Sequence, residues 1–383
     1  MKRIALVLLI LCCAMACQPN GGAAPETPTS PPPTTNDGQR ERGCGNGTCE
    51  GPENAQNCPS DCGSDEDPTP TPTLSAAESA PFYLTTMTHM EGSFEDDQNE
   101  ALFLFHVEQL RYGLTLANEY GAKFTIESEI PFANACEKWG VNAMQEVLDM
   151  GHGVGTHCDV GFQYTPESPE ELAQLYLDRK SLIDDLVGAE HNRGYSGGGS
   201  AVDWVIAGRQ AGFAYKDGGV GMLCLSMPLE NRPSLEWTDE YIRTQAFHEP
   251  APTELEDRIY PFMMENAQDF VPDEDGVLLF SSGGIGRLDS MVEGGPDACP
   301  QMKCPFTEED VDRVVAQLKE IDQMRDRSRI AKANVYVPLI MLKEEYEETW
   351  RYFFEQIQLL EQQGIVTWAT QGEVYDAYIA RNP

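Results

Sequence analysis

Two short segments of the chain place a histidine two residues before an acid. They are Thr88–Gly92, with the sequence THMEG, and Thr156–Asp159, with the sequence THCD. In an extended strand, residues two positions apart point to the same face, so each segment presents an imidazole beside a carboxylate. Such groups bind divalent metal ions. The chain has only six histidines, so these two pairs predict a divalent metal site, the alternative being structural polar groups. The expected ligands are His89, Glu91, His157 and Asp159.

A glycine-rich segment, His191–Ser200 with the sequence HNRGYSGGGS, is a further candidate. Its glycines would let a substrate approach the backbone, and Arg193 is expected to hold a carboxylate ligand or base in place. The alternative is a flexible turn in which Ser200 caps the next helix. The segment lacks the lysine and the spacing of a phosphate-binding loop. His248 lies in an irregular stretch, where it could supply an acid or be an ordinary surface histidine.

The elements that position these residues follow from hydrophobic periodicity in residues 81–383. Apolar or β-branched runs predict strands at 82–90, 122–130, 153–160, 212–215, 277–281, 335–342 and 365–369. Amphipathic patterns predict helices at 98–120, 141–150, 168–189, 200–211, 308–327 and 343–363. Ser168 before Pro169, and Thr307 before three acids, mark two of the helix starts. Repeated strand–helix units predict a parallel α/β barrel, with its chemistry at the carboxyl ends of the strands.

The first 80 residues have a different composition. Residues 1–16 resemble an export signal, with two basic residues before an apolar run that is short for a bilayer span. Small residues precede Cys17, as at a bacterial lipoprotein cleavage site. We therefore expect a lipid on Cys17 that anchors the exported protein at the cell surface or at the periplasmic face of a membrane. The alternative is ordinary cleavage that leaves Cys17 free. Polar linkers are expected at 17–43 and 63–80.

The twelve cysteines divide by position. In an oxidising compartment, four of them within 44–62 predict a small module stapled by two disulfides. A second local bridge is expected between Cys299 and Cys304. The later cysteines that remain are odd in number, so at least one should be a free thiol. They are Cys136, Cys158 and Cys224.

The chain is strongly acidic, with 26 lysines and arginines against 63 aspartates and glutamates and a formal net charge of −37. Binding to a phosphate backbone is electrostatic and needs basic residues, which excludes nucleic acid as a partner. Hydrophobic residues make up 41% of the chain, enough for a sizeable core. Most of the acids are therefore expected on a solvated surface.

The segment Met144–His157, with the sequence MQEVLDMGHGVGTH, resembles the polysaccharide deacetylase (NodB-homology) superfamily. In that family, Leu-Asp-x-Gly-His-x-Val/Ile-Gly-x-His delivers a metal-binding histidine. The segment Asn118–Ile126, NEYGAKFTI, is similar to the family's helix-to-strand junction, and the resemblance covers most of 81–383. It implies a distorted (β/α)7 barrel that holds a divalent metal, usually zinc. It also implies that an acidic base activates water to attack an acetyl group while a histidine protonates the leaving group.

The resemblance assigns roles to individual residues. The family's Thr-Phe-Asp-Asp-Gly corresponds to Thr88–Gly92, so Glu91 matches the metal-binding acid and Met90 takes the place of the usual base. Either His89 or Asp159 would then act as the base, or the metal set is rearranged to include both. Arg193 falls where the family has Arg-x-Pro-Tyr.

Two family positions differ here. The usual second metal-binding histidine is Gly161, and the late Leu-x-His that supplies the acid is not found. Three functions follow as expectations. The first is a metal-dependent carbohydrate deacetylase acting on a neutral or cationic glycan, since the acidic surface disfavours polyanions. The second is a glycoside hydrolase that uses Glu91 and Asp159 as its carboxylate pair. The third is a non-catalytic carbohydrate-binding lipoprotein.

Overall fold

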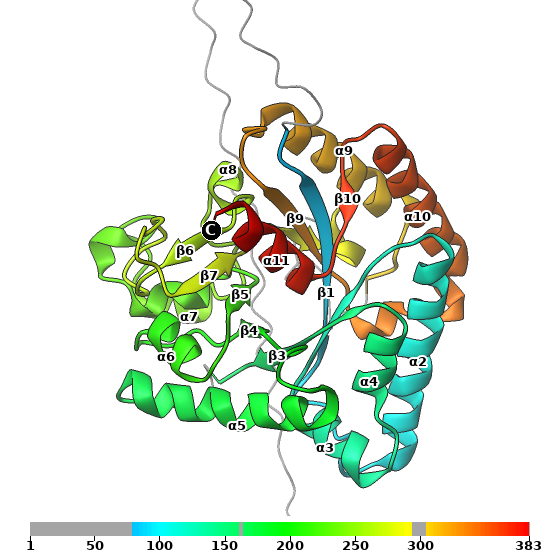
Figure 1. Ribbon diagram of the computed structural model, residues 1–383, viewed down its shortest axis with the longest axis horizontal. Helices are drawn as coiled ribbons and strands as arrows, with labels where there is room; N and C mark the ends of the chain where they lie inside the picture. Colours follow the sequence, from blue (N-terminus) through cyan, green and yellow to red (C-terminus); the bar gives the residue numbers. More distant parts are fainter. Residues whose placement is uncertain (1–78, 161–163, 293–303, 383) are drawn as a thin grey trace, which may run out of the picture. The chain divides into compact units, whose positions relative to one another are not determined.

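The computed structural model describes residues 79–160, 164–292 and 304–382 (Figure 1). The predicted export signal, linkers and cysteine-rich module fall within residues 1–78, and Cys299 and Gly161 fall in the two internal gaps. The predictions made for them concern residues outside this range and stay predictions. Among the described residues, no helix is long and apolar enough to cross a bilayer.

The described chain is built on one largely parallel sheet. Its strands follow the spatial order β6-β7-β5-β4-β3-β2-β1-β9-β8, with β10 added beside β1. Neighbouring strands are parallel except for β6 and β7. The strands are β1 (Phe82–Met90), β2 (Thr125–Ser128), β3 (Gly153–Cys158), β4 (Gly194–Gly197), β5 (Tyr215–Asp217), β6 (Phe262–Met264), β7 (Leu278–Ser281), β8 (Gly284–Arg287), β9 (Ala331–Tyr336) and β10 (Thr367–Trp368).

A bent segment connects the two sides of this sheet. β7 pairs with β5, and β8, which begins three residues after β7 ends, pairs with β9. Gly283 at the bend has φ of +68°, a left-handed conformation that glycine adopts without the strain of a side chain. The chain from β7 to β8 therefore links β5 to β9 and closes the strands into a distorted (β/α)7 barrel, which confirms the predicted fold class.

Helices surround the barrel (Figure 1). They are α2 (Glu100–Glu119), α3 (Ile130–Lys138), α4 (Ala143–Asp149), α5 (Pro169–Val187), α6 (Trp204–Gln210), α7 (Asp239–Thr244), α8 (Leu255–Arg258), α9 (Glu308–Met324), α10 (Glu347–Gln362) and α11 (Gln371–Arg381). Both predicted helix starts are confirmed. Ser168 accepts a hydrogen bond from the Glu171 amide, and Thr307 forms a capping box with Asp310.

Two apolar layers separate the strands from their helices. One contains Phe103, Phe124, Trp350 and Phe354, between β1, β2 and helices α2 and α10. The other lies under α5 and α6 and contains residues such as Trp204. Burial of each large apolar side chain contributes roughly 1.5–3 kcal/mol, so these layers hold the barrel in shape. A third apolar cluster, including Trp237, fills the long segment that follows β5.

The inner face of the barrel is polar, in contrast to these outer layers. Pleating and register place alternate residues of each strand inside. His89 of β1 lies opposite Glu127 of β2, and His157 of β3 lies opposite Ser196 of β4. The same alternation puts Asp217 on the inner face of β5. The inner face therefore holds His89, Glu127, His157, Ser196 and Asp217.

Several predicted boundaries are wrong, for identifiable reasons. The strand expected at 335–342 is β9, which runs from Ala331 to Tyr336 and is followed by a 3-10 turn at Leu339–Met341. Buried Lys332 and Asn334 interrupt its apolar pattern. The glycine-rich segment expected to be a loop contains β4, in which Tyr195 alone is large and apolar.

Candidate metal centre

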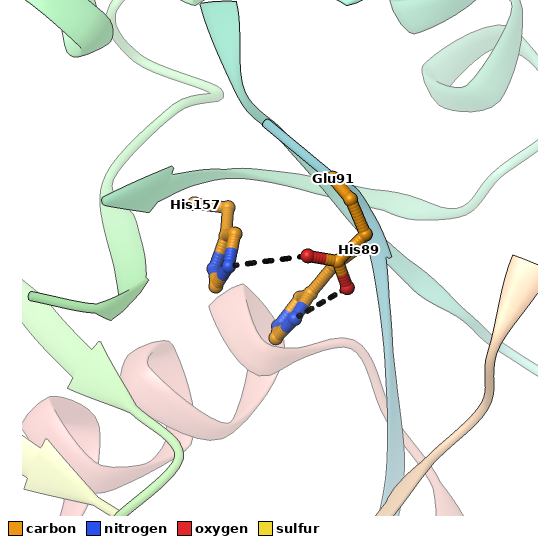
Figure 2. Close-up of side chains that lie close together, drawn as sticks. All are labelled: His89, Glu91 and His157. Carbon is orange, nitrogen blue, oxygen red and sulfur yellow. Dashed lines mark ion pairs between the residues drawn. The ribbon is translucent and has the colours of Figure 1, made fainter. Parts of the chain in front are cut away.

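Three predicted ligands converge at the carboxyl ends of β1 and β3. His89 is the penultimate residue of β1, Glu91 directly follows that strand, and His157 is the penultimate residue of β3. His89 Nδ1 lies 3.8 Å from Glu91 Oε1, and His157 Nε2 lies 4.0 Å from Glu91 Oε2. Figure 2 shows the carboxylate facing both rings. One ligand atom from each of the three residues lies within 4.8 Å of the other two.

Glycines let the strands place these groups so closely. Gly155 precedes His157 by two residues on the same face, and a Cβ there would lie 3.1 Å from Glu127 Cγ. Gly197 ends β4 with φ of +66°, and its Cβ would lie 3.2 Å from His157 Cε1. A side chain at either position would push against the site. Glycine at these two positions therefore leaves room for the side chains of Glu127 and His157.

The two imidazoles stack on each other, with His157 buried and the His89 side chain 14% exposed. Their centroids are 3.8 Å apart with an interplanar angle of 20°. Burial is the main cause that lowers the pKa of His89, and it lowers the pKa of His157 well below 6.5, with further lowering by His89. Both rings are therefore neutral at neutral pH, which is the state that binds a metal. The Glu91 side chain is 34% exposed, so the site opens to solvent.

The donor set fits a divalent ion. Tetrahedral zinc bound at about 2.0–2.1 Å separates its ligand atoms by roughly 3.4 Å. The separations of 3.8 and 4.0 Å between Glu91 and the two imidazoles are close to this value. Two neutral imidazoles and one carboxylate are also the ligand chemistry that zinc takes at catalytic sites. His89, Glu91 and His157 could therefore hold the ion and leave a position open for substrate.

A second set of polar groups surrounds the three residues. The Tyr336 hydroxyl donates to Glu91 Oε1 over 2.9 Å. Ser196 Oγ lies 2.8 Å from His157 Nδ1 and 3.1 Å from His89 Nε2. These contacts hold the Glu91 carboxylate and the two imidazole rings in their orientations.

Buried charges lie beneath the site. Glu127 Oε2 is 3.2 Å from His89 Nε2. Burial raises the pKa of Glu127, and it raises the pKa of Asp217 well above its ordinary value, with Glu127 adding to the effect. Burial also lowers the pKa of Lys216 to about 8 and that of Lys332 to about 7. Two carboxyls and two amines thus influence one another's ionisation within the barrel.

Asp159, the fourth predicted ligand, lies outside the group of three. It follows β3, and its backbone N–H donates to Glu129 Oε1 over 2.8 Å. Glu129 is itself paired with buried Arg179 at 3.3 Å. Burial raises the pKa of Asp159, followed by the negative charge of Glu91, while His89 and His248 act in the opposite direction. Asp159 therefore stands beside the site as a partly buried carboxyl.

The position of Arg193 requires a correction. It precedes β4, whereas the site lies at the other end of the strands. Its guanidinium donates to both carboxylate oxygens of Asp376 in α11, at 2.6 and 2.9 Å. Helix α11 packs at this opposite end, where the Gln371 amide donates to Thr125 Oγ1. The structure therefore does not bring Arg193 to the site carboxylates, because the residue stands at the amino end of its strand.

The cysteines outside the N-terminal region agree with part of the prediction. Cys136, Cys158 and Cys224 are free and buried. Cys158, between His157 and Asp159, has a pKa raised well above 9.0 by burial. A buried thiol of this kind is a poor metal ligand and nucleophile.

No protein-family model and no curated protein sequence matches the chain. Solved structures do. A Mycobacterium smegmatis protein assigned as a polysaccharide deacetylase superposes with a TM-score of 0.50 and 10% identity, covering 81% of this chain and 94% of that one. The chain has the NodB-type deacetylase fold. The PuuE allantoinase also matches this fold, with a TM-score of 0.50 and 11% identity over 79% of this chain and 91% of that one. At such identities the likeness establishes the fold alone.

Proposed function

We propose that the chain is a metal-dependent hydrolase that removes acyl groups from carbohydrate, as a deacetylase does. The observation that carries the proposal is the convergence of His89, Glu91 and His157 at the carboxyl end of a barrel with the deacetylase fold. In barrels of this kind, the carboxyl ends of the strands are where catalytic groups gather. The fold makes the activity reasonable, and the ligand set gives it a chemical basis.

A bound divalent ion supplies Lewis-acid chemistry, since it polarises a carbonyl and lowers the pKa of water. The chain's own residues would hold and orient the components. Glu91 supplies the charge, while neutral His89 and His157 supply nitrogen ligands. The hydrogen bond from Tyr336 holds Glu91 on the side of the two rings.

Asp159 is the residue that best fits the general base. His89 was the alternative, but its two nitrogens face Glu91 on one side and Ser196 with Glu127 on the other. Asp159 has a pKa raised by burial and by Glu91, and a carboxyl of this kind accepts a proton more readily than an exposed one.

His248 is the candidate acid. It is exposed, it comes from the long segment after β5, and it is one of the charges that influence Asp159. Imidazole is a common general acid in catalytic sites, and the exposed ring of His248 is accessible to substrate. It would replace the late histidine that the sequence lacks.

Two other functions give different outcomes in the same assay. A glycoside hydrolase would use Glu91 and Asp159 as a carboxylate pair, but the two imidazoles beside Glu91 favour a metal over that use. An allantoinase-like amide hydrolysis is the other candidate, because the PuuE allantoinase superposes with the same TM-score as the Mycobacterium smegmatis protein. The preferred substrate remains an acylated neutral or cationic glycan, because the net charge of −37 repels polyanions.

Metal content and product release together test the proposal. The protein would be loaded with zinc, dialysed and measured by elemental analysis, then assayed for acetate release from acetylated chito- and xylo-oligosaccharides, with allantoin as a separate substrate. We expect about one ion per chain in the wild type and less than a tenth of it after Glu91→Ala or His157→Ala. His191→Ala is the matched control, since it removes an exposed imidazole before β4, away from the site.

Each outcome has a clear meaning. Stoichiometric metal with acetate release that is lost in both site variants supports the proposal. Wild-type protein without bound metal, or acetate release that survives the loss of metal, overturns it. If the protein binds metal and hydrolyses allantoin but none of the acetylated oligosaccharides, its activity is the hydrolysis of cyclic amides.

A further inference from the structure

Ser196 lies between the two site imidazoles. Its Oγ is 2.8 Å from His157 Nδ1 and 3.1 Å from His89 Nε2. These nitrogens face away from Glu91, whose oxygens are nearest to the other nitrogen of each ring. Ser196 is 1% exposed, so its hydroxyl is shielded from bulk solvent. One hydroxyl thus contacts the outer nitrogen of both rings.

The single proton of this hydroxyl constrains both tautomers. A serine accepts up to two hydrogen bonds and donates one. If Ser196 donated to a neutral ring, that ring would carry its own proton on the nitrogen facing Glu91 and could not bind a cation there. If Ser196 accepts from both rings, each nitrogen facing Glu91 keeps a free lone pair.

Glu127 favours the second arrangement. Its Oε2 lies 3.2 Å from His89 Nε2, and neither of its oxygens makes an aligned hydrogen bond within the described part of the chain. A buried carboxylate needs donors. An N–H on His89 Nε2 would point to Glu127 as well as to Ser196. The Ser196 hydroxyl, which also influences Glu127, would then be free to donate to that carboxylate.

We propose that Ser196 is a positioning residue that accepts an N–H from His89 and from His157, so that both rings present a lone pair beside Glu91 for a divalent ion. The inference rests on the proposed metal-dependent function. It predicts different neutral tautomers, with the proton on Nε2 in His89 and on Nδ1 in His157. Outer partners of metal-binding histidines typically change metal affinity 10–100-fold.

Another role for Ser196 comes from its neighbours in the sequence. Gly194–Gly198 reads GYSGG, which has the spacing of the nucleophile elbow of serine hydrolases. An elbow exposes its serine on a sharp turn between a strand and a helix. Ser196 instead lies within β4, on the buried inner face. The structure therefore favours positioning over nucleophilic attack.

Nitrogen NMR of the metal-free protein tests the tautomers directly. Long-range ¹H–¹⁵N spectra at pH 7.5 distinguish protonated from unprotonated ring nitrogens, and His89→Gln and His157→Gln would assign the signals. We expect an unprotonated Nδ1 in His89 and an unprotonated Nε2 in His157. A proton on either of these nitrogens would overturn the proposal, whatever the protein binds.

Metal affinity in Ser196→Ala gives the second test. We expect zinc to bind 10–100-fold more weakly than in the wild type, measured by competition with a chromophoric chelator. Ser282→Ala is the matched control, since Ser282 is also 1% exposed but donates to the Ala251 carbonyl. It should stay within about twofold of the wild type. Ser196→Thr keeps a hydroxyl and should restore much of the affinity.

The outcomes separate this inference from the function on which it rests. An affinity of Ser196→Ala within twofold of the wild type contradicts the positioning role while leaving the metal site in place. Wild-type protein without metal affinity contradicts the proposed function, and the tautomers remain measurable. Labelling of Ser196 by a fluorophosphonate probe would show that it is a nucleophile and would also overturn the inference.

Discussion

Acid should destabilise this protein through His152, a buried histidine that directly precedes β3, at the opposite end of that strand from the metal centre. Its Nδ1 accepts a hydrogen bond from the Phe124 amide over 3.1 Å, and its Nε2 lies 3.4 Å from the Leu114 carbonyl. His152 as a whole is 4% exposed. Protonation of Nδ1 would break the bond to Phe124 and place a charge in the apolar layer. Burial accordingly lowers the pKa of His152 to about 4.

The size of the effect follows from this pKa. In the unfolded chain His152 titrates near 6.5, so between pH 6.5 and about 4 the unfolded state binds more protons than the folded state. The stabilising contribution is therefore complete above pH 6.5 and declines as the pH falls toward 4. At pH 4 the loss reaches about 3 kcal/mol.

The assay compares urea unfolding of the wild type and His152→Asn at pH 7, 5.5 and 4. The asparagine carbonyl can still accept from Phe124, but the amide does not titrate. The variant should be less stable at pH 7, because it packs less well, and should lose about 3 kcal/mol less than the wild type between pH 7 and 4. His191→Asn, which removes an exposed ring, should not change the slope. Equal slopes for the wild type and His152→Asn would refute the reasoning.

Three further predictions follow from single residues. Gly194→Ala would drive a Cβ into the buried ring of Tyr215, whereas Gly284→Ala meets nothing within 4 Å; we expect a loss of at least about 2 kcal/mol in the first and little in the second, by urea unfolding. Tyr336→Phe removes the hydrogen bond to the site carboxylate, so zinc should bind about tenfold more weakly in a chelator competition, and unchanged affinity would contradict this role. Cys17→Ser should abolish incorporation of labelled palmitate in bacterial cells, and continued labelling would refute the lipid on Cys17.

Hydrophobic patterning predicts the outer layers of this barrel well. The nine residues of β1 are found where the run Phe82–Met90 places them, because a strand buried on both faces leaves a continuous signal. The helix starts at Ser168 and Thr307 are also found, since cap chemistry is local. These features depend on neighbours in the sequence, which a single chain displays.

The inner face of the barrel is harder to predict from the sequence. Its residues are polar although they are buried, so polarity does not indicate exposure there. Lys332 and Asn334 are buried residues of β9. Because they are polar, the apolar pattern places this strand too late in the sequence, over residues that form a 3-10 turn. β4 gives almost no signal for the same reason. A period-two pattern of polar residues within a buried strand is the available sign, and Thr125 with Glu127 in β2 shows it as well.

The residues of the site differ in the same way, since some can be predicted from the local sequence and others cannot. His89 and Glu91 are predictable as a pair, because they lie at one strand end and the pleat turns them to the same face. His157 is predictable because the carboxyl ends of the parallel strands of a barrel gather at one face. Ser196 and Tyr336 are not, because their contacts depend on the register between strands that are distant in the sequence. Arg193 was placed by its position in a motif, and the direction of β4 puts it at the wrong end.

The balance of buried charge explains why Glu91 should be the carboxylate that attracts an ion. Glu127 and Asp217 lie deeper, near Lys216 and Lys332, so their charges are already offset within the barrel. Glu91 contacts neutral groups instead, namely two imidazoles and the phenol of a tyrosine. A divalent ion bound there would leave a net charge of +1 at the open face of the site. Under the proposed function, this positive charge would favour the oxygen of an acyl group, while the net charge of −37 on the chain would disfavour anionic polymers.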